Sequence, residues 1–350
     1  MDKEYAPHYN LSNEILKQLT EISSMEGQLK ATKTSTSNRQ EISYLANIDS
    51  VHFSTKLEGN MLTHKQVTEL LSGKSTPVKS QRDLKEIVNY AKARSVLFDK
   101  ATQNNTLSKA LILKVHHILM NRIVSGKLKG YFRDSQNVIK DAKSRKIVYL
   151  PPEAPDVGPL MKRLIRWVQK SLLCDLSPYI VAAIFHYAFV TIHPFMDGNG
   201  RTARLLSSYI LLSNNIYLPE YASLEKQHEN HRRDYYHQLR QRQSHTYYDI
   251  PKDIDLTSWI SYFLTSLHAA YEEGLAKLGV HVTPETIHLD HRLEKALSLF
   301  KKHRQLKASE YEVLMGLGRT QAVNDLNQLI KKNLVSRIGG GRSSVYKLNT

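Results

Sequence analysis

The chain has 350 residues, of which 41% are hydrophobic, and a formal net charge of +16. This length is enough for one large hydrophobic core and a second small one, and a single cysteine excludes a framework of intrachain disulfides. The sequence has no run of eighteen apolar residues and its polar start is unlike a signal peptide, so we expect a cytoplasmic protein without a membrane span. The excess of basic over acidic residues is typical of proteins that bind nucleotides or nucleic acids, although it can also serve solubility alone.

Two helical patterns occupy the N-terminal part, over about 12–25 and 37–58. The second pattern ends with Ser54 and Glu58 one turn apart on the same face, and Gly59 is well placed to end the helix. Taken alone, a glutamate before a terminal glycine is unremarkable.

Two further helices are predicted over about 81–103 and 108–128, and we interpret His116 in the second as a packing or surface residue.

After these helices the spacing of hydrophobic residues changes from that of a helix to that of a strand. Residues 132–139 and 146–150 are short β-like runs around a polar turn, which predicts a hairpin. A lone hairpin is marginally stable, so we expect it to pack on the helices.

An apolar segment over 179–192 follows Ser177 and Pro178 and predicts a buried helix that ends at His193. The next residues form a loop, and a helix opens with Arg201. Glycines at 198 and 200 permit close backbone approach, so that their amides can form a nest for an anion. The helix N-terminus favours the same charge, and Arg201 and Arg204 lie one turn apart. The stretch therefore predicts a phosphate site.

The same stretch, HPFMDGNGRTAR over 193–204, resembles the signature of the Fic family, HPFxxGNGRxxR, at all eight fixed positions. The resemblance implies a mainly α fold, in which a helical core carries a β-hairpin flap. It also implies an enzyme that transfers AMP from ATP to a Tyr, Thr or Ser hydroxyl of a target protein, or of itself, and releases pyrophosphate.

Site residues follow from the resemblance. His193 would be the catalytic base, and Asp197 would hold Mg²⁺. The predicted nucleotide-binding residues are Gly198, Asn199, Gly200, Arg201, Thr202, Ala203, Arg204, Tyr235 and Tyr236. The tyrosine pair lies on a helix that resembles the family's adenine-binding helix, but this chain has Gln243 where some relatives have Asn.

Regulation is implied as well. Ser54 to Gly59 is similar to the family's inhibitory motif, so that Glu58, with Ser54, would restrain the enzyme from an inhibitory helix at about 37–58. The flap, at about 133–150, would bind the target protein by strand pairing.

Beyond a helix over 255–278 the pattern changes to three short helices and a hairpin, which is similar to a winged helix. Twelve Lys or Arg stand against four Asp or Glu between 292 and 350, so DNA binding and protein docking or a homodimer both stay open. We therefore predict an N-terminal helical region over 1–110, a Fic core over 111–280 and a winged-helix domain over 281–350.

Two alternatives to plain AMP transfer remain. Glu58 could activate water for AMP removal, which would make the enzyme bifunctional. The chain could also be a DNA-binding regulator whose Fic core senses a nucleotide.

Overall fold

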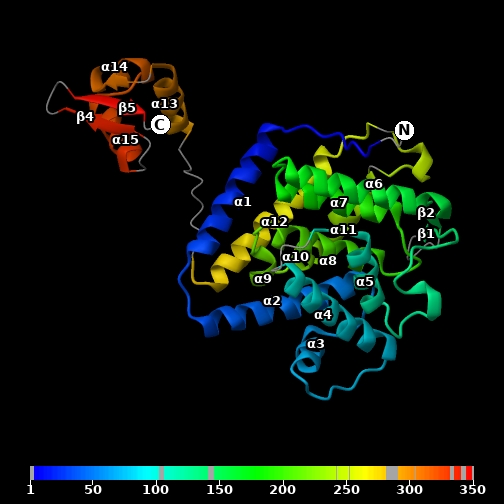
Figure 1. The fold of residues 1–350 in the computed structure, drawn as a ribbon. Helices are drawn as coiled ribbons and strands as arrows, with labels where there is room; N and C mark the ends of the chain where they lie inside the picture. The colour runs from blue at the N-terminus through cyan, green and yellow to red at the C-terminus, as the bar shows by residue number, and fades with distance from the viewer. Residues whose placement is uncertain are drawn as a thin grey trace. The chain divides into compact units, whose positions relative to one another are not determined.

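The computed structural model of the protein describes residues 4–101, 106–140, 146–241, 243–251, 253–280, 291–303, 305–331, 335–339 and 344–348. The chain divides into two compact units, Met1–His281 and Val282–Thr350, which are treated separately. The described part is mainly helical with two small antiparallel sheets, as predicted (Figure 1). None of its helices is both long and apolar enough to cross a bilayer.

The elements of the first unit alternate long core helices with short connecting turns. They are α1 (Asn13–Ala31), α2 (Thr36–Leu57), α3 (His64–Leu71), α4 (Gln81–Ala101), α5 (Lys109–Leu119), η1 (Gly126–Leu128), β1 (Ile139–Lys140), β2 (Ile147–Tyr149), α6 (Ala154–Leu173), α7 (Pro178–Ile192), α8 (Asn199–Leu212), α9 (Leu218–Tyr221), α10 (Leu224–Asn230), α11 (Arg232–Gln241), η2 (Tyr247–Asp249) and α12 (Thr257–Lys277).

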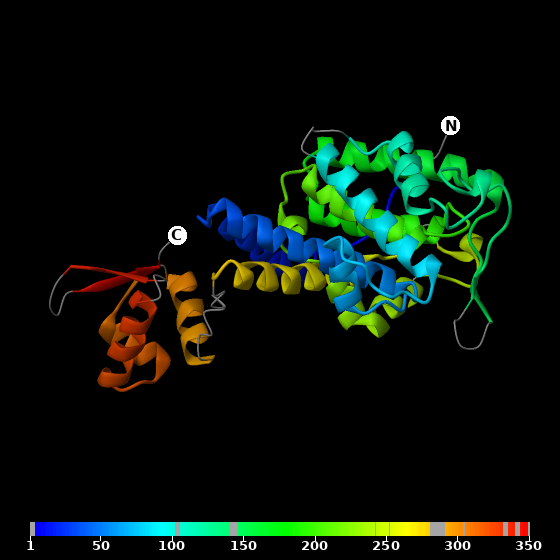
Figure 2. The same cartoon turned by 90° about the horizontal axis from the view of Figure 1, so that it is seen from below.

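Helix α7 is the centre of this unit. It contacts α6, α8 and α12, and all its residues except Pro178 and Val190 are buried (Figures 1 and 2). A helix that is apolar on every side gains most by complete burial. Its C-terminal end therefore has a fixed position, and this end delivers His193.

Two predicted elements are shorter than expected. Helix α5 ends at Leu119, because Arg122 adopts a positive φ of 58° and Asn89 donates to the carbonyls of Leu119 and Asn121. The first flap strand covers only Ile139–Lys140. The residues ahead of it bond instead to the loop after α7, where the Arg133 amide donates to the Pro194 carbonyl.

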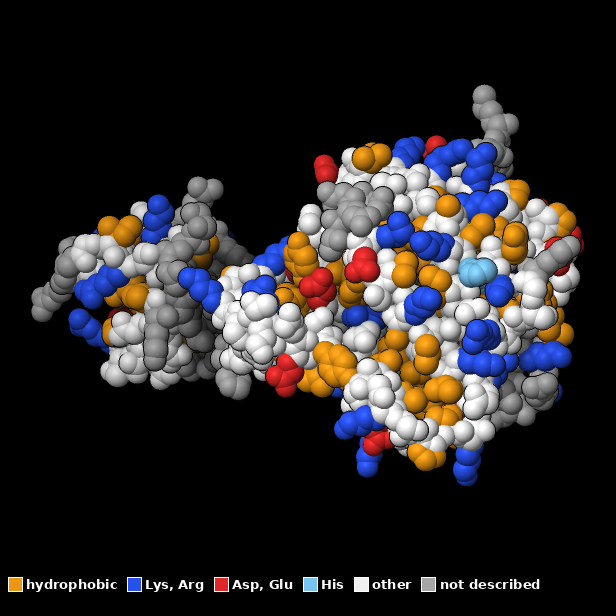
Figure 3. Space-filling model, turned by 60° about the horizontal axis from the view of Figure 1, so that its bottom comes forward, with side chains coloured by type: hydrophobic (Ala, Val, Ile, Leu, Met, Phe, Trp, Pro, Cys, Tyr) orange, Lys and Arg blue, Asp and Glu red, His pale blue; other side chains and the backbone are white. Residues whose placement is uncertain are grey.

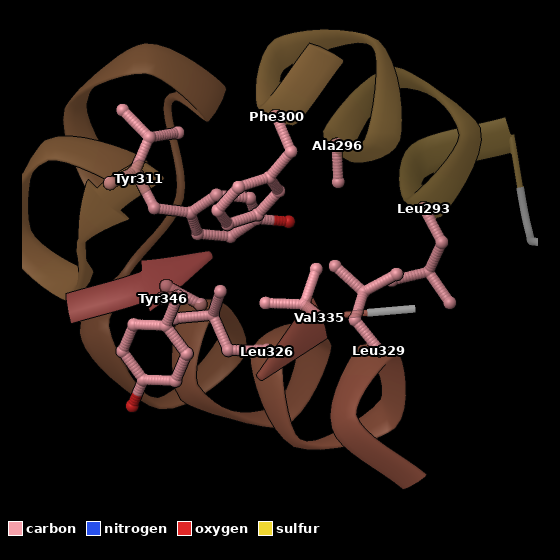
Figure 4. Close-up of a cluster of buried hydrophobic side chains, with 10 residues drawn as sticks. Leu293, Ala296, Phe300, Tyr311, Leu326, Leu329, Val335 and Tyr346 are labelled. Atoms are coloured by element: carbon pink, nitrogen blue, oxygen red, sulfur yellow. The ribbon is translucent and has the colours of Figure 1, made fainter. Parts of the chain in front are cut away.

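The second unit contains α13 (His291–His303), β3 (Gln305–Lys307), α14 (Ala308–Met315), α15 (Arg319–Lys331), β4 (Val335–Ile338) and β5 (Val345–Leu348). Its sheet has the order β3-β5-β4 and is antiparallel throughout. Strand β3 was not predicted. A separate core fills this unit, with Phe300 stacked on Tyr311 (Figure 4).

Candidate active site

His193 lies at the end of α7 in a left-handed backbone conformation, with φ 52° and ψ 59°. Its amide still donates to the Phe189 carbonyl, so the helix closes normally before the chain turns away. A non-glycine residue in this region stores about 1 kcal/mol or more of strain, which the surrounding contacts must hold. The turn points the imidazole out of the core, and the side chain is half-buried.

One ring nitrogen of His193 is free to take a proton. Nδ1 lies 3.1 Å from the Val190 carbonyl, and because a carbonyl only accepts, Nδ1 carries the hydrogen. Nε2 then has a lone pair. Burial lowers the pKa of His193 to about 4, so the ring is neutral at physiological pH.

Arg133 holds the backbone at His193 and at the residue after it, a role that the sequence analysis did not predict. Its Nε donates to the His193 carbonyl at 3.0 Å and its backbone amide to the Pro194 carbonyl at 2.9 Å. Its Nη1 donates to Ser135 and its Nη2 to Pro152, both at the carbonyl oxygen. The guanidinium is buried and thereby ties the base of the flap to the loop.

The loop itself is braced from within. The Phe195 amide donates to Asn199 Oδ1 at 2.9 Å, and Asn199 Nδ2 donates back to the Phe195 carbonyl at 2.8 Å. Thr202 Oγ1 donates to the Gly198 carbonyl, and Ala203 is buried inside α8. The side chains of Asn199 and Thr202 therefore brace the loop, and that of Ala203 packs inside the helix.

His116 is the packing residue that the sequence indicated, with a role in the same loop. Its ring stacks on Phe195 with centroids 3.6 Å apart. Nδ1 accepts from the Gly130 amide, so Nε2 donates to the Asp197 carbonyl at 2.9 Å. Burial lowers the pKa of His116 to about 4, which fits this neutral ring.

The start of α8 brings Arg201 and the first amides of the helix together with Asp197 and Arg82, a group of residues that we call the anion pocket. Asp197 accepts from the Gly198 amide at 2.6 Å, from Arg201 Nη2 at 3.1 Å and from Arg82 Nη2 at 2.6 Å. Burial opposes its ionisation, but Arg201 and Arg82 hold the pKa of Asp197 below the usual range. Arg201 Nη1 also lies 3.1 Å from Glu86, while its buried Nε has no hydrogen-bond partner among the described residues. An anion entering this pocket would supply that partner.

Glu58 lies at the same helix start. Its Oε1 accepts from Arg204 Nη2 at 2.7 Å, and Arg204 also donates to the Ser54 hydroxyl and carbonyl at 2.9 and 2.8 Å. A Cβ on Gly200 would lie 2.2 Å from Glu58 Oε1, so only glycine admits this contact. Burial favours the neutral acid, but Arg204 and Arg201 lower the pKa of Glu58. Glu58 is therefore an ionised carboxylate that pairs with Arg204 in the anion pocket.

The two tyrosines on α11 have different surroundings. Tyr235 is 1% exposed, and its hydroxyl lies 2.9 Å from Nε2 of His186, a fully buried residue of α7. Tyr236 is half-buried and donates to the Leu57 carbonyl at 2.9 Å. The structure thus brings Tyr236 to the end of α2 beside Glu58, whereas Tyr235 belongs to the core.

A metal site made only of protein groups is absent from the described residues, which hold no cluster of three His, Cys, Asp or Glu side chains. Mg²⁺ in nucleotide sites usually takes one or two carboxylates, and phosphates and water complete its shell. Asp197 fits this use because it is ionised and partly exposed, and one of its partners, Arg82, is an exposed side chain.

Comparison with known proteins agrees with this geometry. Residues 106–211 match the family model described as "Fic/DOC family". The chain is similar to the "Protein adenylyltransferase Fic" of Drosophila erecta, with 29% identity over 199 residues, and to that of Drosophila yakuba, with 31% over 193 residues. These matches cover 56% and 54% of the chain but 38% and 36% of the relatives, so the chain spans less than two fifths of their length.

Solved structures agree on the fold. A Fic family protein from Desulfovibrio desulfuricans aligns over 99% of this chain and 98% of its own, with a TM-score of 0.64 and 23% identity. A Fic domain containing signaling protein from Bacteroides thetaiotaomicron aligns over 75% of this chain and 98% of its own, with a TM-score of 0.63 and 19% identity. The chain therefore has a Fic fold, and the part that matches the Fic/DOC family model includes His193 and Arg204.

Proposed function

We propose that the protein transfers AMP from ATP to a hydroxyl group of a target protein and releases pyrophosphate. The observation that carries this proposal is the pairing of a free imidazole lone pair with an anion pocket. His193 Nε2 stands at one side of the loop, and Arg201, Arg204 and the first amides of α8 form the other.

In the proposed reaction the target's hydroxyl oxygen forms a bond to the α-phosphorus of ATP. The bond from that phosphorus to the oxygen bridging to the β-phosphate breaks, and pyrophosphate leaves with the electron pair. His193 Nε2 takes the hydroxyl proton. Anionic phosphates beside the ring would raise its pKa from the low value set by burial, which makes it a stronger base when ATP is bound.

The pocket residues have separate tasks in this proposal. The amides at Asn199 and Gly200 and the Nε of Arg201 would bind phosphate oxygens, because the first amides of a helix have no partner within the helix. Arg204 would bind the γ-phosphate. Asp197 would hold Mg²⁺, which neutralises phosphate charge when bound. Tyr236 would lie near the adenine.

We also propose that Glu58 restrains the enzyme. Its carboxylate pairs with Arg204 and contacts Gly200, which is the place a γ-phosphate would need. ATP could then enter without its phosphates in the productive position. The same carboxylate could instead activate water for AMP removal, and that reaction would release AMP from a modified protein in a manner that depends on Glu58.

The target would bind at the flap. Strands β1 and β2 pair only with each other in the described part of the chain, so an extended target segment could add to them through backbone hydrogen bonds. Tyr149 fixes the flap's base, because its hydroxyl donates to the Thr191 carbonyl at 2.9 Å.

Labelled ATP tests the reaction. Label from the α-phosphate should stay on protein, whereas label from the γ-phosphate should not. His193→Ala should lower the rate by roughly 10² to 10⁴, the usual loss for one general base, while ATP binding persists. Activity within threefold of wild type would overturn the assignment of His193.

A further inference from the structure

The second unit contains a pair of helices joined like a helix-turn-helix. Helix α14 ends at Met315, and α15 begins at Arg319 after a turn that contains Gly316 and Gly318. Gly316 has a φ of 65°, a conformation that few other residues adopt. In such pairs the second helix is the one that enters the DNA major groove.

One face of α15 holds it in the unit's core. Leu326 and Leu329 point toward Val335 and Phe300 (Figure 4), and Ala322 is fully buried beside them. The only acidic residue of α15, Asp325, is also fully buried and accepts from the Tyr311 hydroxyl at 3.3 Å. The outward face of α15 therefore carries no negative charge.

The outward face carries uncharged polar side chains at helical spacing. They are Thr320, Gln321, Asn324, Asn327 and Gln328, all exposed. Spacings of three and four residues place them on one side of the helix. Asn and Gln amides can bond both N6 and N7 of adenine, the pair of groups that a major-groove helix reads.

The same unit carries exposed cations. Arg319 begins α15, and Lys307, Arg337 and Lys347 are exposed on the sheet. Between 292 and 350 there are twelve Lys or Arg against four Asp or Glu. Figure 3 shows one side of the structure, on which basic side chains outnumber acidic ones in the described part of each unit.

We propose that the second unit binds duplex DNA, with the outward face of α15 reading base edges and the surrounding cations contacting phosphates. The centre of a protein-docking surface is usually apolar and rich in aromatic residues. The outward face of α15 has neither kind of side chain, whereas its amides match base recognition. The proposal does not depend on AMP transfer.

Selection from a random library of duplexes, about 30 bp long and at roughly 50 to 100 mM salt, tests the full chain. The wild type should enrich one sequence. The double variant Asn324→Ala/Gln328→Ala should lose this enrichment while its affinity for random duplex changes less than about threefold. Gln305→Ala is the matched control, because it removes an exposed amide from β3 and should keep the enrichment.

A phosphate contact has a different signature. Arg337→Ala should weaken binding to every sequence and lower the slope of log affinity against log salt by about one. His193→Ala should bind DNA as the wild type does, which separates this proposal from the enzymatic one. No duplex binding by the folded wild type, or the same enriched sequence with the double variant, would overturn the proposal. The exposed Val313 and Leu314 on α14 would then favour docking of a protein.

Discussion

Replacing Glu58 with glycine should activate the enzyme. Its carboxylate follows directly after α2 and lies close to both Arg204 and Gly200. Without it, Arg204 still donates to the hydroxyl and carbonyl of Ser54, so the guanidinium should stay where a γ-phosphate could reach it. The substitution therefore removes the carboxylate that would compete with the γ-phosphate, and it keeps Arg204, the proposed ligand of the γ-phosphate.

The size of the effect follows from the contact. Glu58 is 32% exposed at its side chain and Arg204 is 2% exposed, so the pair is partly screened. A hydrogen bond between charged groups contributes about 1.5 to 3 kcal/mol, and because the Arg204 side of the pair is buried we take the upper part of that range, about 2 to 3 kcal/mol. If this energy holds the pocket closed, its loss raises the open population roughly 30- to 150-fold, at tenfold per 1.4 kcal/mol. The same loss should lower Tm by several degrees.

Initial rates of self-modification with α-labelled ATP measure the gain, and thermal unfolding measures the stability. The double variant Glu58→Gly/Arg204→Ala is the control, because it frees the pocket but removes the γ-phosphate ligand, and it should stay slow. Equal rates for wild type and Glu58→Gly would refute the inhibitory role. A rate increase that persists in the double variant would show that Glu58 does not restrain the enzyme by pairing with Arg204.

Two further predictions use the same assay in the Glu58→Gly background. Because burial lowers the pKa of His193 to about 4, the base stays deprotonated at neutral pH. The value of kcat/KM for ATP should therefore hold as pH falls to roughly 5 and decline only near 4, and a midpoint between pH 6 and 7 would contradict this reasoning. Deleting residues 282–350 should leave transfer in place, since every proposed site residue lies in the first unit, and a truncated protein that folds but is inactive would show that the second unit belongs to the catalytic part.

The sequence predicted the fold well wherever the signal was local. The apolar run before His193 needs only its own composition to indicate a buried helix, and the glycines, Asp197 and arginines of the loop lie within twelve residues of one another. Glu58 could be singled out as well, because the residues from Ser54 to Gly59 resemble a known inhibitory motif. In each case neighbouring residues, or a known motif, carried the information.

Contacts between distant segments were missed. Arg82 lies 115 residues before Asp197, with which it pairs, and Glu86 approaches Arg201 over a similar separation. Arg82 and Glu86 lie one turn apart on α4 and resemble a surface ion pair in the sequence. Only the packing of α4 beside α8 makes them part of the anion pocket.

Arg133 is the clearest of these cases, and it leads to a last prediction. Four of its donors bind the carbonyls of His193 and Pro194 and two carbonyls at the flap's base, next to the residue that has the positive φ. Lysine keeps the charge but cannot reach several carbonyls with fixed geometry. Arg133→Lys should therefore lower kcat by roughly 10- to 100-fold through a misplaced imidazole, with KM for ATP nearly unchanged because Arg133 contacts no proposed phosphate ligand. Arg166→Lys, at an exposed position on α6, is the control. A fall in ATP affinity with kcat preserved would show that Arg133 acts on the nucleotide and not on the position of the base.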